Sequence, residues 1–126
     1  MDKNVISTAE APEAIGPYSQ AVATQGMVYC SGQVALDPQS GELVGETVAD
    51  QTKRCMDNLG AVLRAAGTDF DRVVKVTAYL TDIADFPEFN EVYGQFFSSE
   101  PPARATVGVA ALPKGARVEV DCIALA

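Results

Sequence analysis

The amino-acid sequence predicts an α+β fold: a two-layer sandwich in which a mixed sheet of five to six strands carries two helices on one face. Two stretches repeat apolar residues at the three- and four-residue steps of amphipathic helices, and β-branched or aromatic runs precede and follow them. The last run, residues 117–125, has apolar residues on both of its faces. Because two helices cover only one face of such a sheet, we expect a homo-oligomer to cover the rest.

The first third of the chain is predicted to form strands joined by turns. Residues 18–23 and 27–34 have the composition of strands, and Thr24-Gln25-Gly26 between them has the length of a hairpin turn. Residues 37–41, Asp-Pro-Gln-Ser-Gly, follow with strong turn chemistry, since proline presets φ and glycine tolerates a positive φ.

Two helices and three further strands are expected in the remainder. A long helix is predicted between an N-cap at Thr47 and a stop at Gly67, and a second over residues 86–97. Residues 73–80 are typical of a mostly buried central strand, and residues 104–110 and 117–125 of two closing strands. No repeat, low-complexity tract or charge block divides the chain, so we place a single domain at residues 1–126.

The composition disfavours or excludes several classes of function. Nine Lys and Arg residues against 17 Asp and Glu residues leave a net charge of −8, which disfavours nucleic acid or an anionic membrane as a partner. The absence of histidine excludes imidazole catalysis and histidine-ligated metals. The three cysteines are widely spaced along the sequence, which is typical of reduced core thiols; they are Cys30, Cys55 and Cys122. With no apolar signal core and no membrane-spanning run, we expect a cytoplasmic protein without a cofactor.

Two charged residues are candidates for chemistry. Arg104 opens a strand of small residues, where its guanidinium can bind a carboxylate bidentately; the alternative is a solvated or acid-paired arginine at a strand edge. Glu119 is a carboxylate within an apolar alternation, where burial would raise its pKa and suit it to proton transfer. The alternative for Glu119 is a solvated outer-face residue, which the nearby Asp121 favours.

Three uncharged positions are weaker candidates. Tyr18 lies in a rigid Gly-Pro turn that either holds its phenol at the rim of a site or packs it half-buried. Gly32, between Ser31 and Gln33, interrupts a strand and marks either a plain bulge or a close approach of a ligand. Asn90 interrupts the aromatic stripe of the second helix, and lies either at the surface or in a cleft.

Short segments spread in order over nearly the whole chain form a common pattern. They are Ala14-Ile15-Gly16-Pro17-Tyr18-Ser19-Gln20-Ala21, Ser31-Gly32-Gln33, Asp37-Pro38, Gly41-Glu42, Gln51-Thr52, Asn58-Leu59, Ala65-Ala66-Gly67, Val73-Val74-Lys75, Asp85-Phe86, Asn90-Glu91-Val92-Tyr93, Pro102-Ala103-Arg104, Leu112-Pro113-Lys114-Gly115 and Val118-Glu119-Val120. In this pattern the sequence closely resembles the RidA (YjgF-type) reactive-intermediate deaminases.

The resemblance implies a chorismate-mutase-like α+β fold, a homotrimer and active sites in the clefts between subunits, without metal or organic cofactor. The implied reaction is the hydrolysis of enamine/imine intermediates, namely 2-aminoacrylate with its tautomer 2-iminopropanoate, and 2-iminobutanoate, to 2-oxo acids and ammonia. Pyridoxal-phosphate-dependent dehydratases release these intermediates, which gives a functional link to such enzymes. The enzyme activity that the resemblance implies is therefore that of a 2-iminobutanoate/2-iminopropanoate deaminase.

The family's functional residues fall on particular positions of this sequence. The carboxylate-binding arginine corresponds to Arg104 and the water-orienting glutamate to Glu119. The remaining substrate-binding positions correspond to Tyr18, Ser31, Gly32, Asn90 and Thr106. The sequence departs from the family at Thr106, where some members carry cysteine, and at Gly108, where many have a longer residue.

Two other classes of function remain open from the sequence. The same trimer cleft could bind and sense 2-oxo acids or other small carboxylates without turnover, since Arg104 serves both purposes and Glu119 matters mainly for hydrolysis. Ribonuclease, translation-inhibitor or holdase activity is the third class, and the acidic composition with only four lysines weakens its RNA-binding form.

Overall fold

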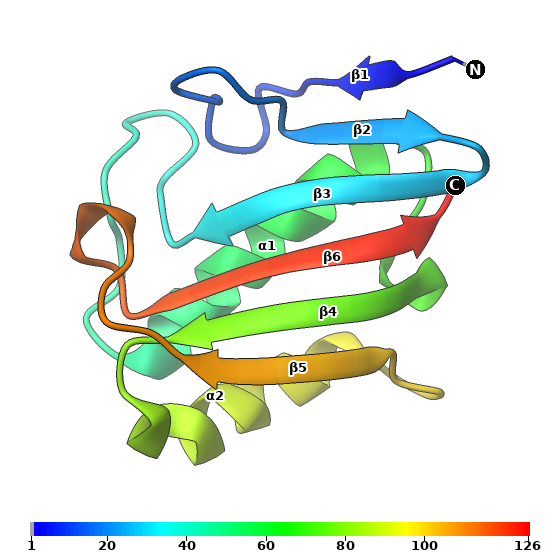
Figure 1. Cartoon of the computed structure of the whole chain (residues 1–126). Helices are drawn as coiled ribbons and strands as arrows, with labels where there is room; N and C mark the ends of the chain where they lie inside the picture. The colour runs from blue at the N-terminus through cyan, green and yellow to red at the C-terminus, as the bar shows by residue number, and fades with distance from the viewer. Residues whose placement is uncertain (1) are drawn as a thin grey trace.

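The computed structural model describes residues 2–126, which form one six-stranded sheet with two helices on one of its faces (Figure 1). The predicted α+β sandwich is therefore confirmed. Within these residues the strand order is β1-β2-β3-β6-β4-β5, and only the β4–β5 pair is parallel. The elements in chain order are β1 (Asn4–Ile6), β2 (Ala21–Thr24), β3 (Met27–Val34), α1 (Val48–Ala65), β4 (Val73–Leu80), α2 (Phe86–Tyr93), β5 (Ala103–Gly108) and β6 (Val118–Leu125).

Helix α1 begins and ends where the sequence predicts. The Thr47 hydroxyl accepts a hydrogen bond from the backbone N–H of Asp50 at 3.0 Å, which satisfies one of the free donors at the helix start. Gly67 follows the helix at φ +84°, a conformation that favours glycine. The predicted apolar stripe packs against the sheet, and Cys55, Met56 and Leu59 are fully buried.

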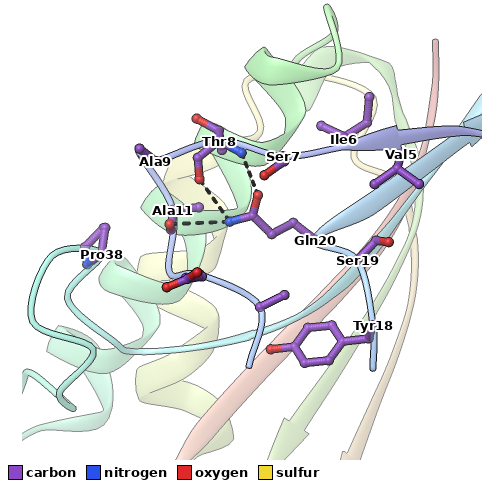
Figure 2. A pocket seen from close by; sticks show the side chains of 12 residues that line it. Val5, Ile6, Ser7, Thr8, Ala9, Ala11, Tyr18, Ser19, Gln20 and Pro38 are labelled. Atoms are coloured by element: carbon purple, nitrogen blue, oxygen red, sulfur yellow. Dashed lines mark hydrogen bonds between the residues drawn. The ribbon is translucent and has the colours of Figure 1, made fainter. Parts of the chain in front are cut away.

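The start of the sheet differs from the prediction. Strand β2 begins at Ala21 rather than residue 18, because the buried Gln20 side chain organises the preceding loop (Figure 2). Its amide oxygen accepts from the Thr8 N–H at 2.7 Å, and its nitrogen donates to the carbonyls of Thr8 and Pro12 at 3.1 and 2.8 Å. The loop thus satisfies its polar groups through a side chain instead of a strand ladder. The short edge strand β1 was not predicted.

The β2–β3 hairpin is tighter than predicted. Thr24 pairs with Met27, so the loop contains only Gln25 and Gly26, and both have positive φ angles of 51° and 80°. Such paired positive angles match the twist of the flanking strands.

The two faces of the sheet differ in cover. On β6, Val118, Val120, Cys122 and Ala124 are buried against the helices, whereas the alternate residues point to the other side, hereafter the open face. Tyr29, Val107 and Leu125 are 46%, 41% and 39% exposed on this open face. Its apolar residues are consistent with the expectation that another copy of the chain covers it.

Several predicted bounds need correction. Strand β4 has the predicted bounds but is buried on the helix side only, and Val74 and Lys75 are exposed. Helix α2 ends at Tyr93 and continues as a 3-10 turn over Gly94–Phe96. The closing strands are shorter than predicted and start at Ala103 and Val118. Within residues 2–126 no helix has the length and apolar character needed to cross a bilayer.

The N-cap of α1 gives a test of the fold. Thr47→Ala removes the acceptor for the Asp50 N–H, and we expect it to lower the free energy of unfolding by about 1 kcal/mol. Thr47→Ser keeps the acceptor and is the matched control. Urea denaturation at one fixed protein concentration measures both, and equal midpoints for the alanine and serine variants would contradict the capping role.

Candidate functional site

Four of the predicted site residues gather around one cavity. Tyr18, Ser31, Gly32 and Glu119 line a space of about 540 Å³ between the loop before β2, strand β3 and the start of β6. The remaining lining residues are Pro12, Glu13, Ile15, Gln20, Gln33, Val34, Leu36, Pro113 and Lys114. The cavity is mostly apolar with a few polar groups, as small-molecule sites commonly are.

A bulge in β3 makes room for the Glu119 carboxylate. Between Cys30 and Gln33 strand β3 advances three residues while β6 advances two, so the register shifts at Ser31-Gly32. The Glu119 carboxylate lies directly against Gly32, and a Cβ atom at position 32 would overlap its Oε2 atom. The bulge expected at this glycine is therefore confirmed, and the group that approaches its backbone in the structure is a carboxylate of the same chain.

The surroundings of Glu119 alter its ionisation. Burial raises the pKa of Glu119 above its usual value of 4.5, and the negative charge of Asp121 raises it further. Asp121 itself accepts a hydrogen bond from the Tyr79 hydroxyl at 2.9 Å. A half-buried carboxylate with a raised pKa is suited to accept and return a proton, which a fully solvated one does less well near neutral pH.

Backbone contacts fix Ser31 at this cavity, whereas Tyr18 lies at its rim. The Ser31 hydroxyl donates to the Ser19 carbonyl at 2.5 Å, and the Ser31 N–H donates to the Gln20 carbonyl at 2.9 Å. Tyr18 is 52% exposed, so its ring lies at the rim rather than in the core. It also lines a second hollow, of about 500 Å³, beside the loop that Gln20 organises (Figure 2).

The other three predicted residues lie at the opposite edge of the sheet. The Arg104 Nη1 atom on β5 donates to the Asn90 Oδ1 atom on α2 at 2.7 Å. Thr106, two residues further along β5, has a buried hydroxyl without a hydrogen-bond partner among residues 2–126. Asn90 is exposed and thus lies at the surface, where it orients the arginine.

The two groups of residues do not meet within one chain. Arg104 pairs with the buried Val76, and its side chain lies on the helix side of the sheet. Glu119 pairs with Tyr79 on the open face, and strand β4 separates β5 from β6. Arg104 is not among the residues that line the cavity beside Glu119. A site that uses both residues therefore requires a second copy of the chain.

Sequence reasoning missed two residues of this region. Gln20 was identified only as part of the pattern over residues 14–21, because its role depends on carbonyls eight to twelve residues away. Lys114 was identified only as part of a turn, but it lines the cavity with Glu119 and holds a left-handed φ of 62°. The three cysteines are free and buried, and no group of metal-ligating side chains is found within residues 2–126.

Comparison with known proteins gives the family. Residues 8–126 match the model of the endoribonuclease L-PSP family, and the chain belongs to this family. A human relative named 2-iminobutanoate/2-iminopropanoate deaminase is 54% identical over 98% of this chain and 90% of its own. An Arabidopsis thaliana relative, Reactive Intermediate Deaminase A, chloroplastic, is 48% identical over 97% of this chain and 65% of its own. The family expected from the sequence is thus confirmed.

The fold is shared with solved structures as well. The crystal structure of Escherichia coli TdcF with bound serine has a TM-score of 0.92 and 40% identity, over 98% of both chains. That protein, whose structure holds an amino acid, has the same arrangement of strands and helices as this chain.

The raised pKa of Glu119 can be tested directly. Asp121→Asn removes the neighbouring negative charge, so the pKa of Glu119 should fall toward 4.5 without reaching it, since burial remains. Carboxyl carbon NMR titration, assigned with Glu119→Gln, measures the shift. An unchanged pKa in Asp121→Asn, or an ordinary pKa in the wild type, would contradict the described environment.

Proposed function

We propose that this protein is a cofactor-free deaminase that hydrolyses 2-iminobutanoate and 2-iminopropanoate to 2-oxo acids and ammonia. The observation that supports this proposal most directly is a pair of complementary groups. Arg104 is half-buried and held by a neutral amide, and Glu119 is a carboxylate of raised pKa beside a cavity. The names of relatives at 48–54% identity support the same reaction.

Substrate binding rests on Arg104. A 2-imino acid carries a carboxylate next to its reactive carbon, and a guanidinium binds such a group with two parallel hydrogen bonds. The Nη1 atom of Arg104 is oriented by Asn90, which leaves other N–H groups of the fork for the substrate. The proposed role of Asn90 is thus to orient the Arg104 guanidinium toward the substrate.

Hydrolysis rests on Glu119. With the imine protonated on nitrogen, the Glu119 carboxylate accepts a proton from water as the water oxygen bonds to the carbon and the C=N π electrons pass to nitrogen, which gives a neutral carbinolamine. Glu119 then returns this proton to the nitrogen. As the C–N bond breaks and ammonia leaves, the carboxylate takes the hydroxyl proton, the C=O bond of the 2-oxo acid forms, and the proton is finally released to ammonia as ammonium. Imines hydrolyse in water even without a catalyst. Positioning the water against a fixed substrate is therefore enough for catalysis. Tyr18 and Ser31 would form the wall around the reacting carbon.

The site is proposed to form between subunits of a homotrimer. Arg104, Asn90 and Thr106 of one copy face Tyr18, Ser31, Gly32 and Glu119 of the next, because these groups lie apart in a single chain. A ring of three copies joined by one repeated contact gives three equivalent sites. The apolar open face supplies the surface for such an assembly.

The reaction implies a metabolic setting. Enzymes that eliminate water or another group from serine or threonine through pyridoxal phosphate release the substrates, and a deaminase would remove these reactive species. We propose a cytoplasmic location, which suits the three free, buried cysteines. The chloroplastic relative indicates that family members also work elsewhere.

Carboxylate sensing is the second candidate function. Arg104 would bind a 2-oxo acid whether or not turnover follows, so only hydrolysis at Glu119 separates the two functions. RNA cleavage, which the family description names, fits less well, because the chain has a net charge of −8 and only four lysines.

The test is 2-oxobutanoate formation while a threonine dehydratase generates 2-iminobutanoate, with semicarbazide trapping the imine that remains. Wild-type protein should accelerate product release, and Arg104→Ala should abolish the effect because the substrate carboxylate loses its partner. Arg104→Lys keeps the charge but not the fork, and should lower kcat/KM by at least about tenfold.

The exposed Arg64 supplies the control, since Arg64→Ala changes the net charge equally, on helix α1 instead of β5. Equal losses in the Arg64 and Arg104 variants would contradict the site. No acceleration by the wild type would contradict the deaminase and leave carboxylate sensing.

A further inference from the structure

One face of helix α2 lies against the guanidinium group of Arg104. The Arg104 Cζ atom lies 4.8 Å from the Tyr93 ring centroid, 5.3 Å from that of Phe86 and 5.9 Å from that of Phe89. Asn90, the fourth residue, accepts the hydrogen bond described above. The four positions have the spacing i, i+3, i+4 and i+7, so they form one stripe of the helix.

This stripe does more than fill the core. Phe89 is fully buried and Tyr93 is 6% exposed, and their ring centroids stack 5.3 Å apart, so packing restrains both rings. The three rings next to Arg104 are hereafter called the aromatic platform. All three centroid distances lie within the range at which a cation is attracted by an aromatic ring. Burial raises the pKa of the Tyr93 phenol, while the positive charge of Arg104 opposes that shift.

Arg104 also lacks an acidic partner. Within residues 2–126 no Asp or Glu oxygen forms an ion pair with it, although the sequence has 17 acidic residues. Arg117 shows the contrast, because it binds the Asp85 carboxylate at 3.0 Å. Rings and an amide orient a guanidinium without neutralising it, whereas a protein carboxylate would occupy the fork that a substrate needs.

We propose that Phe86, Phe89 and Tyr93 are positioning residues that hold Arg104 on an aromatic platform, so that the substrate carboxylate is its first anionic partner. This inference rests on the proposed function for its substrate, and on the geometry alone for the platform. The Tyr93 ring is the nearest of the three to the Arg104 Cζ atom, so we assign the effect to the ring, and the Tyr93→Phe variant separates it from the hydroxyl.

The proposal predicts different binding and kinetic constants for three variants. Tyr93→Leu removes the nearest ring and should raise KM for 2-iminobutanoate, and Kd for 2-oxobutanoate, by about tenfold, with kcat changed by less than about threefold. Tyr93→Phe restores the ring and should bring both constants back to near the wild-type values. Phe97→Leu is the matched control, since Phe97 packs against Tyr93 with centroids 4.9 Å apart but is not among the rings in contact with Arg104.

Two kinetic outcomes would overturn the platform. Equal impairment of Tyr93→Phe and Tyr93→Leu would show that the hydroxyl is what matters. Equal impairment of Phe97→Leu and Tyr93→Leu would show a packing role alone. Circular dichroism and the oligomeric state of each variant identify any change that comes from loss of folding.

An NMR measurement without ligand tests the aromatic platform independently of the proposed function. The Nε–H resonance of Arg104, assigned with Arg104→Lys, should be shifted upfield by the ring currents in the wild type and in Tyr93→Phe. It should return toward the ordinary position in Tyr93→Leu. An unshifted resonance in the wild type overturns the platform, whereas a shifted resonance without imine hydrolysis contradicts only the proposed function.

Discussion

The arrangement of this protein depends on one constraint: two helices cover a six-stranded sheet on one face only. Alternation along β6 therefore buries Val118, Val120 and Cys122 against the helices and leaves Glu119 on the open face. Arg104 lies on the helix side of the edge strand β5. The two groups that the proposed chemistry needs are thus placed apart within one chain, and the proposed contact with another copy would bring them together.

Within residues 2–126, neither Arg104 nor Glu119 forms an ion pair. Arg104 is held by an amide and three rings, and Glu119 lies against the backbone of Gly32 rather than against a cation. An ion pair within the chain would stabilise each charge and hold the pKa of Glu119 low. Instead burial and Asp121 raise that pKa, which leaves both groups available to a substrate.

Much of this could be predicted from the sequence, because it depends on local patterns. The period of α1, its Thr47 cap and the alternation of β6 require no knowledge of distant contacts. Strand β2 was predicted too early, since Gln20 is fixed by carbonyls far along the chain. The residues of α2 were predicted as a core stripe, but their contact with Arg104 depends on the parallel register that pairs Arg104 with Val76.

The central claim is that one site uses Arg104 of one copy and Glu119 of another. Arg104→Ala and Glu119→Gln chains, each inactive alone, should regain activity when co-expressed with different tags and purified as mixed oligomers. Every mixed ring of three copies contains one intact contact of three, so about a third of wild-type activity is expected. Activity no greater than that of the parent variants, in oligomers shown to be mixed, would contradict a shared site.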